Sequence, residues 1–234
     1  MLYLYYGGWG FMIISLIISM AASAYVKSTF SKYNSVGNSR YMTGSQVARS
    51  ILDSHGLYNI NIIHVAGDLT DYYNNSRQTV ALSDTVYGST SIAAAAVAAH
   101  ECGHAVQYQK EYFPIKVRNF VIPFTQFGSR FWYLSVIIGL IFGNSQIGNI
   151  FLYFGIILLV VICFFQLVTL PVEFNASSRA IKILEEEHIL TLDEIGKARK
   201  VLIAAALTYV AALLTSILQL LRILSIAKNR KDDR

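Results

Sequence analysis

The sequence HECGH at residues 100–104 has the residue types and spacing of an HExxH zinc site. Two imidazoles at positions i and i+4 of a helix lie on one face, so His100 and His104 can both bind a single Zn²⁺. Glu101 then lies beside the water on the metal, where it can accept a proton. The pattern also occurs by chance, but burying these polar groups beside an alanine-rich helix is costly unless a cation neutralises them. We therefore predict zinc binding here.

A catalytic zinc also needs a third protein ligand and an open position. The metzincin pattern requires Gly at position 107 and His at position 110, where this chain has Gln107 and Lys110, so that class is excluded. Site-2 intramembrane proteases take an Asp from a later hydrophobic segment, whereas Asp193 lies among charged residues. Glu173, directly after an apolar segment, fits better. Its alternative reading is a solvated charge at a helix start, which the helix dipole favours.

The elements that position these residues include long uncharged segments. Of the 234 residues, 54% are hydrophobic and 14% are charged, against about a quarter charged in a typical soluble domain. Residues 1–26, 131–172 and 201–221 contain no Asp, Glu, Lys or Arg. This segregation excludes a disordered or nucleic-acid-binding chain and indicates an integral membrane protein. The lipid bilayer is therefore an expected partner, and nucleic acid is not.

About 20 apolar residues in a helix cross the hydrocarbon core of a bilayer. The sequence accordingly predicts about four transmembrane helices, over residues 9–26, 124–142, 150–170 and 201–221. The middle two form a hairpin that turns at residues 143–146. Because two spans separate His104 from Glu173, both emerge on the same side of the membrane. This topology can bring the three predicted ligands together.

Several residues near the predicted spans have two readings. Tyr3, Tyr5, Tyr6 and Trp9 are typical of an interfacial aromatic belt. Cleavage of the first span as a signal peptide is not expected, because no Lys or Arg precedes it. We expect Arg130 to anchor the second span at the interface rather than to stabilise an oxyanion.

The predicted membrane-proximal part is small and of α+β type. The sequence TGSQ at residues 43–46 predicts a capping box that opens a helix, which Gly56 ends. Residues 58–65 and 79–82 are rich in β-forming residues, and an Asp- and Asn-rich turn at residues 68–76 separates them. A two-stranded ribbon is therefore expected.

Three further helices are expected around the predicted site. One is capped by Ser89 or Ser91 and runs through an alanine tract past Gln107. Another follows Pro171, which we expect to punctuate the chain, and continues to about His188. A capping box at residues 191–194 opens the helix that becomes the last span.

The chain is thus predicted to be mainly α, with five consecutive parts. These are a first transmembrane helix (1–26), a zincin-like part with a short β-ribbon (27–123), a transmembrane hairpin (124–170), a third-ligand helix and connection (171–200), and a last transmembrane helix with a basic tail (201–234).

Three stretches resemble the YugP-type membrane zinc metallopeptidases. They are VAAHECGHAVQ at residues 97–107, QLVTLPVEFNASSRA at residues 166–180 and the segment at residues 205–210. The resemblance also takes in NSR at residues 38–40, TG at 43–44 and residues 67–73, so it covers nearly the whole chain. The HExxH pattern is generic, whereas PVEFNAS is specific.

The resemblance implies a gluzincin related in plan to HtpX and the CAAX prenyl proteases. It implies that His100, His104 and Glu173 are zinc ligands and that Glu101 is the catalytic base. Cys102 stands where the family usually has an apolar residue, and we expect a small core residue there. Ser177 stands where gluzincins often have an Asp that orients a ligand His, and a hydroxyl accepts a hydrogen bond more weakly.

The other polar residues that could do chemistry are expected to have structural roles. His55, His64 and His188 lack ligand spacing and are expected at the surface or in turns. Tyr72 and Tyr73 are expected to pack as aromatics rather than to donate a hydrogen bond to a transition state.

Two function classes follow from the sequence. The favoured one is a membrane zinc endopeptidase acting on peptides or on membrane or loosely folded proteins. The alternative is a non-proteolytic scaffold or regulator with a structural zinc, which would not need Glu101.

The distribution of positive charge predicts a multi-pass cell-membrane protein with its site on the cytoplasmic face. Lys27, Lys32 and Arg40 follow the first span, and five basic residues lie in residues 171–200, whereas the hairpin turn has none. The basic tail after the last span would then lie outside, which opposes this orientation. We give it less weight because the other segments all favour a cytoplasmic site.

Overall fold

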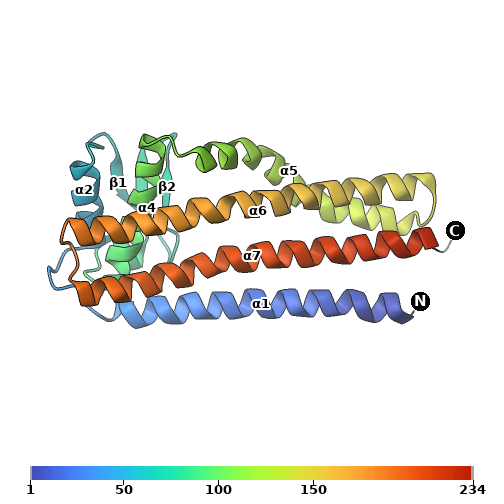
Figure 1. Cartoon of the computed structure of the whole chain (residues 1–234), viewed down its shortest axis with the longest axis horizontal. Coiled ribbons are helices and arrows are strands. Elements are labelled where there is room, and N and C mark those ends of the chain that lie inside the picture. The colour runs from blue at the N-terminus through green and yellow to red at the C-terminus, as the bar shows by residue number, and fades with distance from the viewer. Residues whose placement is uncertain (1, 233–234) are drawn as a thin grey trace. The chain divides into compact units, whose positions relative to one another are not determined.

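A computed structural model describes residues 2–232 of the chain, and the side chains of residues 9–230. The prediction of a mainly α protein with a small β part is confirmed (Figure 1). The elements in chain order are α1 (Leu2–Asn34), α2 (Gly44–Ser54), β1 (Asn61–His64), β2 (Tyr72–Asn74), β3 (Thr79–Leu82), α3 (Asp84–Tyr87), α4 (Ile92–Gln109), α5 (Phe113–Ile141), α6 (Gln146–Glu186) and α7 (Leu192–Asp232).

Three of the described helices are long and apolar enough to cross a membrane, by length and composition. They are α1 from Trp9 onward, α6 and α7. The fourth predicted span lies in α5, which begins at Phe113, well before the predicted start near residue 124. Trp9 is 51% exposed, as an interfacial residue can be, while the side chains of Tyr3, Tyr5 and Tyr6 lie outside the described part.

The chain divides into two compact units. The first comprises Met1–Ala22, Lys116–Leu170 and Thr208–Arg234, and the second comprises Ser23–Ile115 and Pro171–Leu207. The predicted metal ligands all belong to the second unit. The first contains most of the predicted spans.

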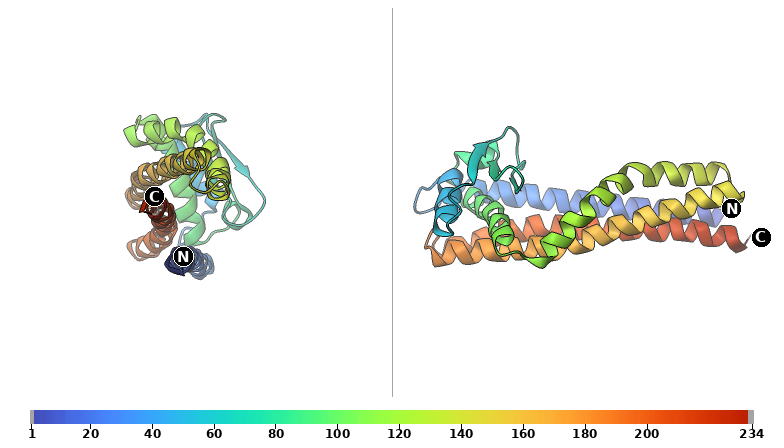
Figure 2. Two further views of the ribbon diagram at one scale, coloured as in Figure 1. Left: turned by 90° about the vertical axis from the view of Figure 1, so that its right-hand side faces the viewer. Right: turned by 90° about the horizontal axis from the view of Figure 1, so that it is seen from above.

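The first unit is organised around the predicted helical hairpin, which the structure confirms (Figure 2). Glycines let α5 and α6 approach closely: a Cβ on Gly155 would lie 2.7 Å from Val136 Cγ2, and one on Gly139 would lie 2.8 Å from Leu152 N. Arg230 of α7 donates from Nη1 to the carbonyls of Gly139 and Gly143 at the hairpin turn.

In the second unit, the predicted two-stranded ribbon is wrong in detail. The sheet has three strands in the order β1-β3-β2, because the segment predicted as a turn contains β2. β1 pairs with β3 in parallel, and β2 pairs with β3 antiparallel. β3 is therefore central, and its four residues are buried. β2 is left as an edge strand.

The capping signals of the second unit are confirmed. Thr43 and Gln46 form both hydrogen bonds of the capping box at the start of α2, and Gly56 follows that helix with φ of +71°. Ser91, rather than Ser89, caps α4 by accepting from the N–H of Ala94 at 3.0 Å. Local polar residues therefore fix where both helices begin.

Pro171 does not interrupt the chain as predicted, because α6 continues through it to Glu186. A proline inside a helix removes one backbone hydrogen bond. The following turns are fully buried at Val172, Ala176 and Ala180, and this packing keeps the segment helical. The helix carrying Glu173 is thus a continuation of the apolar segment.

The turn into α7 is held by Glu194, as the predicted capping box requires. Its carboxylate accepts from the N–H of Thr191 at 2.8 Å and from the N–H of Ser39 at 2.6 Å. The second contact ties the loop after α1 to the start of α7. This explains one role of the NSR segment at residues 38–40.

Candidate metal centre

The HExxH residues lie in the middle of α4, directly after a buried alanine tract. Ala93 to Ala96, Ala98 and Ala99 have no exposed surface, so α4 is the central helix of its unit. His100 and His104 are one helical turn apart, and their ring centroids are separated by 4.8 Å. Both imidazoles therefore face the same side of α4.

A close approach between α4 and α6 brings the third residue to the histidines. Gly103 packs directly on the backbone of Ala176, and a Cβ there would lie 2.7 Å from the Ala176 carbonyl oxygen. No larger residue fits without moving one helix. Glu173 lies one turn before Ala176 on α6, and its side chain is only 2% exposed.

The three predicted ligands converge. Glu173 Oε2 lies 3.3 Å from His100 Nε2 and 3.5 Å from His104 Nε2. Within the described part of the chain, these three residues form a group able to hold a metal ion.

Their spacing and chemistry fit zinc. Ligand atoms bonded to a tetrahedral Zn²⁺ at about 2.0–2.2 Å lie about 3.3–3.5 Å from one another. The separations between Glu173 Oε2 and the two imidazole nitrogens match these values. Two imidazoles and one carboxylate are also a ligand set typical of catalytic zinc, which keeps a fourth position open.

Gln107 orients His104, and sequence reasoning missed this role. The Gln107 side chain is completely buried. Its Oε1 lies 3.0 Å from His104 Nδ1, and its Nε2 donates to the Val172 carbonyl at 2.8 Å and to Asn175 Oδ1 at 3.0 Å. Because Nδ1–H is the only group that can donate to an amide oxygen here, Nε2 of His104 carries the free lone pair for a metal.

Ser177 orients His100 in the same way. Its Oγ lies 3.1 Å from His100 Nδ1, so the hydroxyl can accept from Nδ1–H and leave Nε2 unprotonated. Ser177 follows Glu173 by four residues on α6 and shares its face. Each histidine is thus turned toward Glu173 by a different element.

Glu101 is buried beside the ligand group without belonging to it. Burial raises the pKa of its carboxyl, and the neighbouring imidazoles of His100 and His104 oppose this rise. The carboxyl therefore combines a location next to the histidines with a raised basicity, as a proton acceptor needs.

Comparison with known proteins places the chain in a family. Residues 9–228 match a family described as "Putative neutral zinc metallopeptidase". The chain belongs to this family. It is also 44% identical over 221 residues to "Putative membrane protease YugP" of Bacillus subtilis (strain 168). These 221 residues are 94% of this chain and 96% of that protein. No solved structure matches.

The remaining sequence-predicted residues lie outside the ligand group. Cys102 is buried on another face of α4 with its Sγ 3.6 Å from the Ala48 carbonyl, and burial raises the pKa of its thiol. It is therefore the small core residue that was expected. His55 lies near Glu187, His64 contacts Asp84, and His188 is an exposed turn residue.

Tyr73 packs as an aromatic, as the sequence suggested. Its ring lies 5.6 Å from that of Tyr108 in α4, and its hydroxyl donates to Asn75 Oδ1. Tyr72 is 41% exposed on the edge strand β2. Arg130 is exposed in α5, within the first unit.

Proposed function

We propose that this chain is a membrane zinc endopeptidase in which Glu101 is the general base. The observation that carries the proposal is the convergence of His100, His104 and Glu173 at zinc-ligand spacing, with a buried Glu101 beside them. A purely structural zinc site does not need a further buried carboxyl group that does not bind the metal.

His100, His104 and Glu173 would hold the Zn²⁺, which would supply a Lewis acid for the substrate carbonyl and would lower the pKa of a bound water toward 7. Glu101 accepts the proton of the attacking water and passes it to the leaving amine, which completes hydrolysis of the peptide bond. Gln107 and Ser177 keep both imidazoles in the orientation and tautomer that direct Nε2 at the metal.

The edge strand β2 suggests how a substrate binds. Its outer edge is unpaired within the described sheet, and Tyr73 of β2 packs against α4, the helix that carries HExxH. An extended peptide can pair with such an edge through backbone hydrogen bonds, which tolerate many side chains. We therefore propose peptides and membrane or loosely folded proteins as substrates.

Glu101→Gln tests the function. The amide cannot accept a proton, so proteolysis of an unfolded test protein by the purified full chain should fall at least about a hundredfold. Glu186→Gln, an exposed glutamate of α6, is the matched control and should cleave at the wild-type rate.

Zinc content separates the outcomes. Glu101→Gln should still bind one zinc per chain, because the three ligands are intact. Cleavage by that variant at the wild-type rate would contradict the role of Glu101. A wild-type protein that binds zinc and cleaves none of the tested proteins would favour the scaffold alternative.

A further inference from the structure

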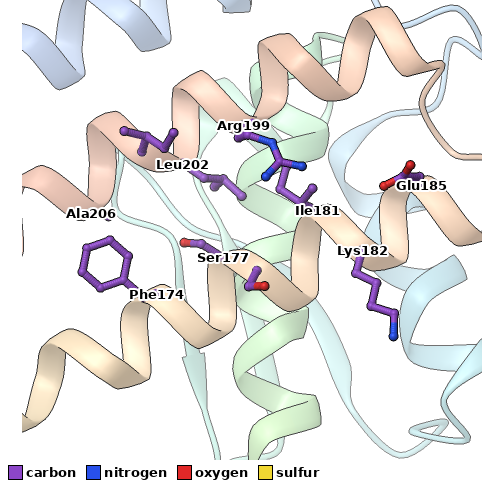
Figure 3. A pocket seen from close by; sticks show the side chains of 10 residues that line it. Phe174, Ser177, Ile181, Lys182, Glu185, Arg199, Leu202 and Ala206 are labelled. Atoms are coloured by element: carbon purple, nitrogen blue, oxygen red, sulfur yellow. The ribbon is translucent and has the colours of Figure 1, made fainter.

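A cavity in the second unit lies between α6 and α7, and none of the three candidate ligands lines it (Figure 3). Its volume is about 300 Å³. It is lined by the part of α6 after Pro171 and by the first turns of α7. Ser177, which contacts His100, also contributes to its wall. We refer to this cavity as the α6–α7 groove.

The groove is apolar at one end and polar at the other. Phe174 and Ala206 lie at the apolar end, while Glu185 lies at the opposite end (Figure 3). Ile203, which also lines the groove, lies one helical turn before Ala206 on α7. Along the chain, Phe174 follows the predicted span that ends at residue 170, and Ile203 and Ala206 belong to the span predicted over residues 201–221. The residues of the apolar end are thus close in sequence to the predicted transmembrane segments, or belong to one of them.

The apolar lining is open rather than filled by the protein. Phe174 is 49% exposed and Ile203 is 50% exposed, whereas Leu202, which also lines the groove, is buried. In water such a surface would be unfavourable. A hydrocarbon chain lying against Phe174 and Ile203 would cover it.

The polar end carries an excess of positive charge. Arg199 and Lys182 line it from opposite helices, against the single carboxylate of Glu185. In the described part of the chain no carboxylate forms an ion pair with Arg199, and Lys182 pairs only with exposed Glu186 at 3.6 Å. Exposed pairs of this kind are weak, so both cations are available to an anion.

We propose that the α6–α7 groove binds one anionic membrane phospholipid. Arg199 and Lys182 hold the phosphate, for which the planar guanidinium and the ammonium are both suited. The first part of one acyl chain lies against Phe174 and Ile203 and continues toward the apolar segments. Basic pockets between helices next to a bilayer recognise acidic lipids in this way.

The shape of the lining favours a lipid over a free anion or a zwitterionic lipid. Inorganic phosphate would satisfy the two cations but leave the apolar half of the groove uncovered. Phosphatidylcholine would cover the apolar half, but its own cation offsets the attraction of its phosphate to Arg199 and Lys182. The proposal does not depend on the peptidase function.

Lipid retention tests the proposal directly. The full-length protein would be purified from nanodiscs made of equal parts phosphatidylcholine and phosphatidylglycerol, and retained lipids counted by native mass spectrometry. The wild-type protein should retain one phosphatidylglycerol in preference to phosphatidylcholine. Lys182→Gln combined with Arg199→Gln should weaken that preference about tenfold, a change of about 1.4 kcal/mol.

Controls separate the groove from general surface charge. Lys200→Gln removes an exposed charge next to Arg199 that does not line the groove, and it should retain phosphatidylglycerol like the wild type. Ile203→Asn should lose the lipid, while inorganic phosphate added to the wild type should fail to displace it. Because all these side chains are exposed, circular dichroism and zinc content should be unchanged.

Three results would overturn the proposal. One is equal phosphatidylglycerol retention by the double variant and the wild type. Another is equal retention of both lipids by the wild type. The third is full displacement of the lipid by phosphate, which would identify an anion site without a lipid preference.

Discussion

At the scale of single residues, the three candidate zinc ligands can be identified from the sequence, whereas the residues that orient them can be identified only in part. His100, Glu101 and His104 lie within five residues of one another, so their spacing on a helix predicts a zinc site from the sequence. Gln107 was missed because one of its partners, the Val172 carbonyl, is 65 residues away and is a backbone atom, which no sequence pattern marks. The only local signal is its position one turn after His104. Ser177 was noted only through the family resemblance.

Gln107→Ala should weaken zinc binding about 10–100-fold, because His104 loses the acceptor that fixes its ring and tautomer. The measurement is zinc competition against a chelator of known affinity. Gln109→Ala is the matched control, since Gln109 lies on the same helix and donates to the His55 carbonyl. Equal zinc affinity of Gln107→Ala and the wild type would refute the positioning role.

Asp84→Asn should reduce the loss of stability in acid. The backbone N–H of Gly67, followed by the His64 side chain, lowers the pKa of Asp84 below its usual value of 3.8. A lowered pKa stabilises the fold above pH 3.8, and that contribution disappears as the pH falls through the folded-state pKa. Melting temperatures recorded from pH 6 to pH 3 should therefore fall less steeply for Asp84→Asn. Parallel curves for the two proteins would show that Asp84 contributes nothing.

At the scale of elements, helix starts were predictable and strand pairing was not. Thr43 and Ser91 act through neighbouring backbone N–H groups, so their effect is local and visible in sequence. β2 has only three residues within an Asp- and Asn-rich stretch, and its stability comes from pairing with β3. The predicted break at Pro171 is wrong because tertiary contacts also decide the structure there. The packing of α6 outweighs the local cost of a proline inside the helix.

Gly103→Ala should separate α4 from α6 and weaken both folding and zinc binding. A Cβ there would lie 2.7 Å from the Ala176 carbonyl oxygen, so one helix must move, at a cost of about 1–3 kcal/mol. Gly196→Ala is the matched control, since Gly196 is also helical but its Cβ would meet nothing within 4 Å. Thermal melts and zinc affinity would be measured for both. Indistinguishable behaviour of the two variants would mean that the close approach is unimportant.

At the scale of the whole molecule, the sequence predicts which face of the membrane carries the site. Cysteine labelling from outside intact cells tests this, with Cys102 and Cys163 replaced to remove background. A cysteine at Ser145, in the turn between α5 and α6, should react, because the uncharged hairpin turn is predicted to be outside. A cysteine at Ser76, between β2 and β3, should not react. The reverse pattern would place the zinc-binding unit on the outer face.

The central claim is that His100, His104 and Glu173 hold one zinc ion. Anomalous diffraction at the zinc edge, from crystals of the full chain, tests it most directly. We predict a single peak within about 2.0–2.2 Å of His100 Nε2, His104 Nε2 and a Glu173 carboxylate oxygen. A metal bound with a different third ligand, or no peak between α4 and α6, would contradict the claim.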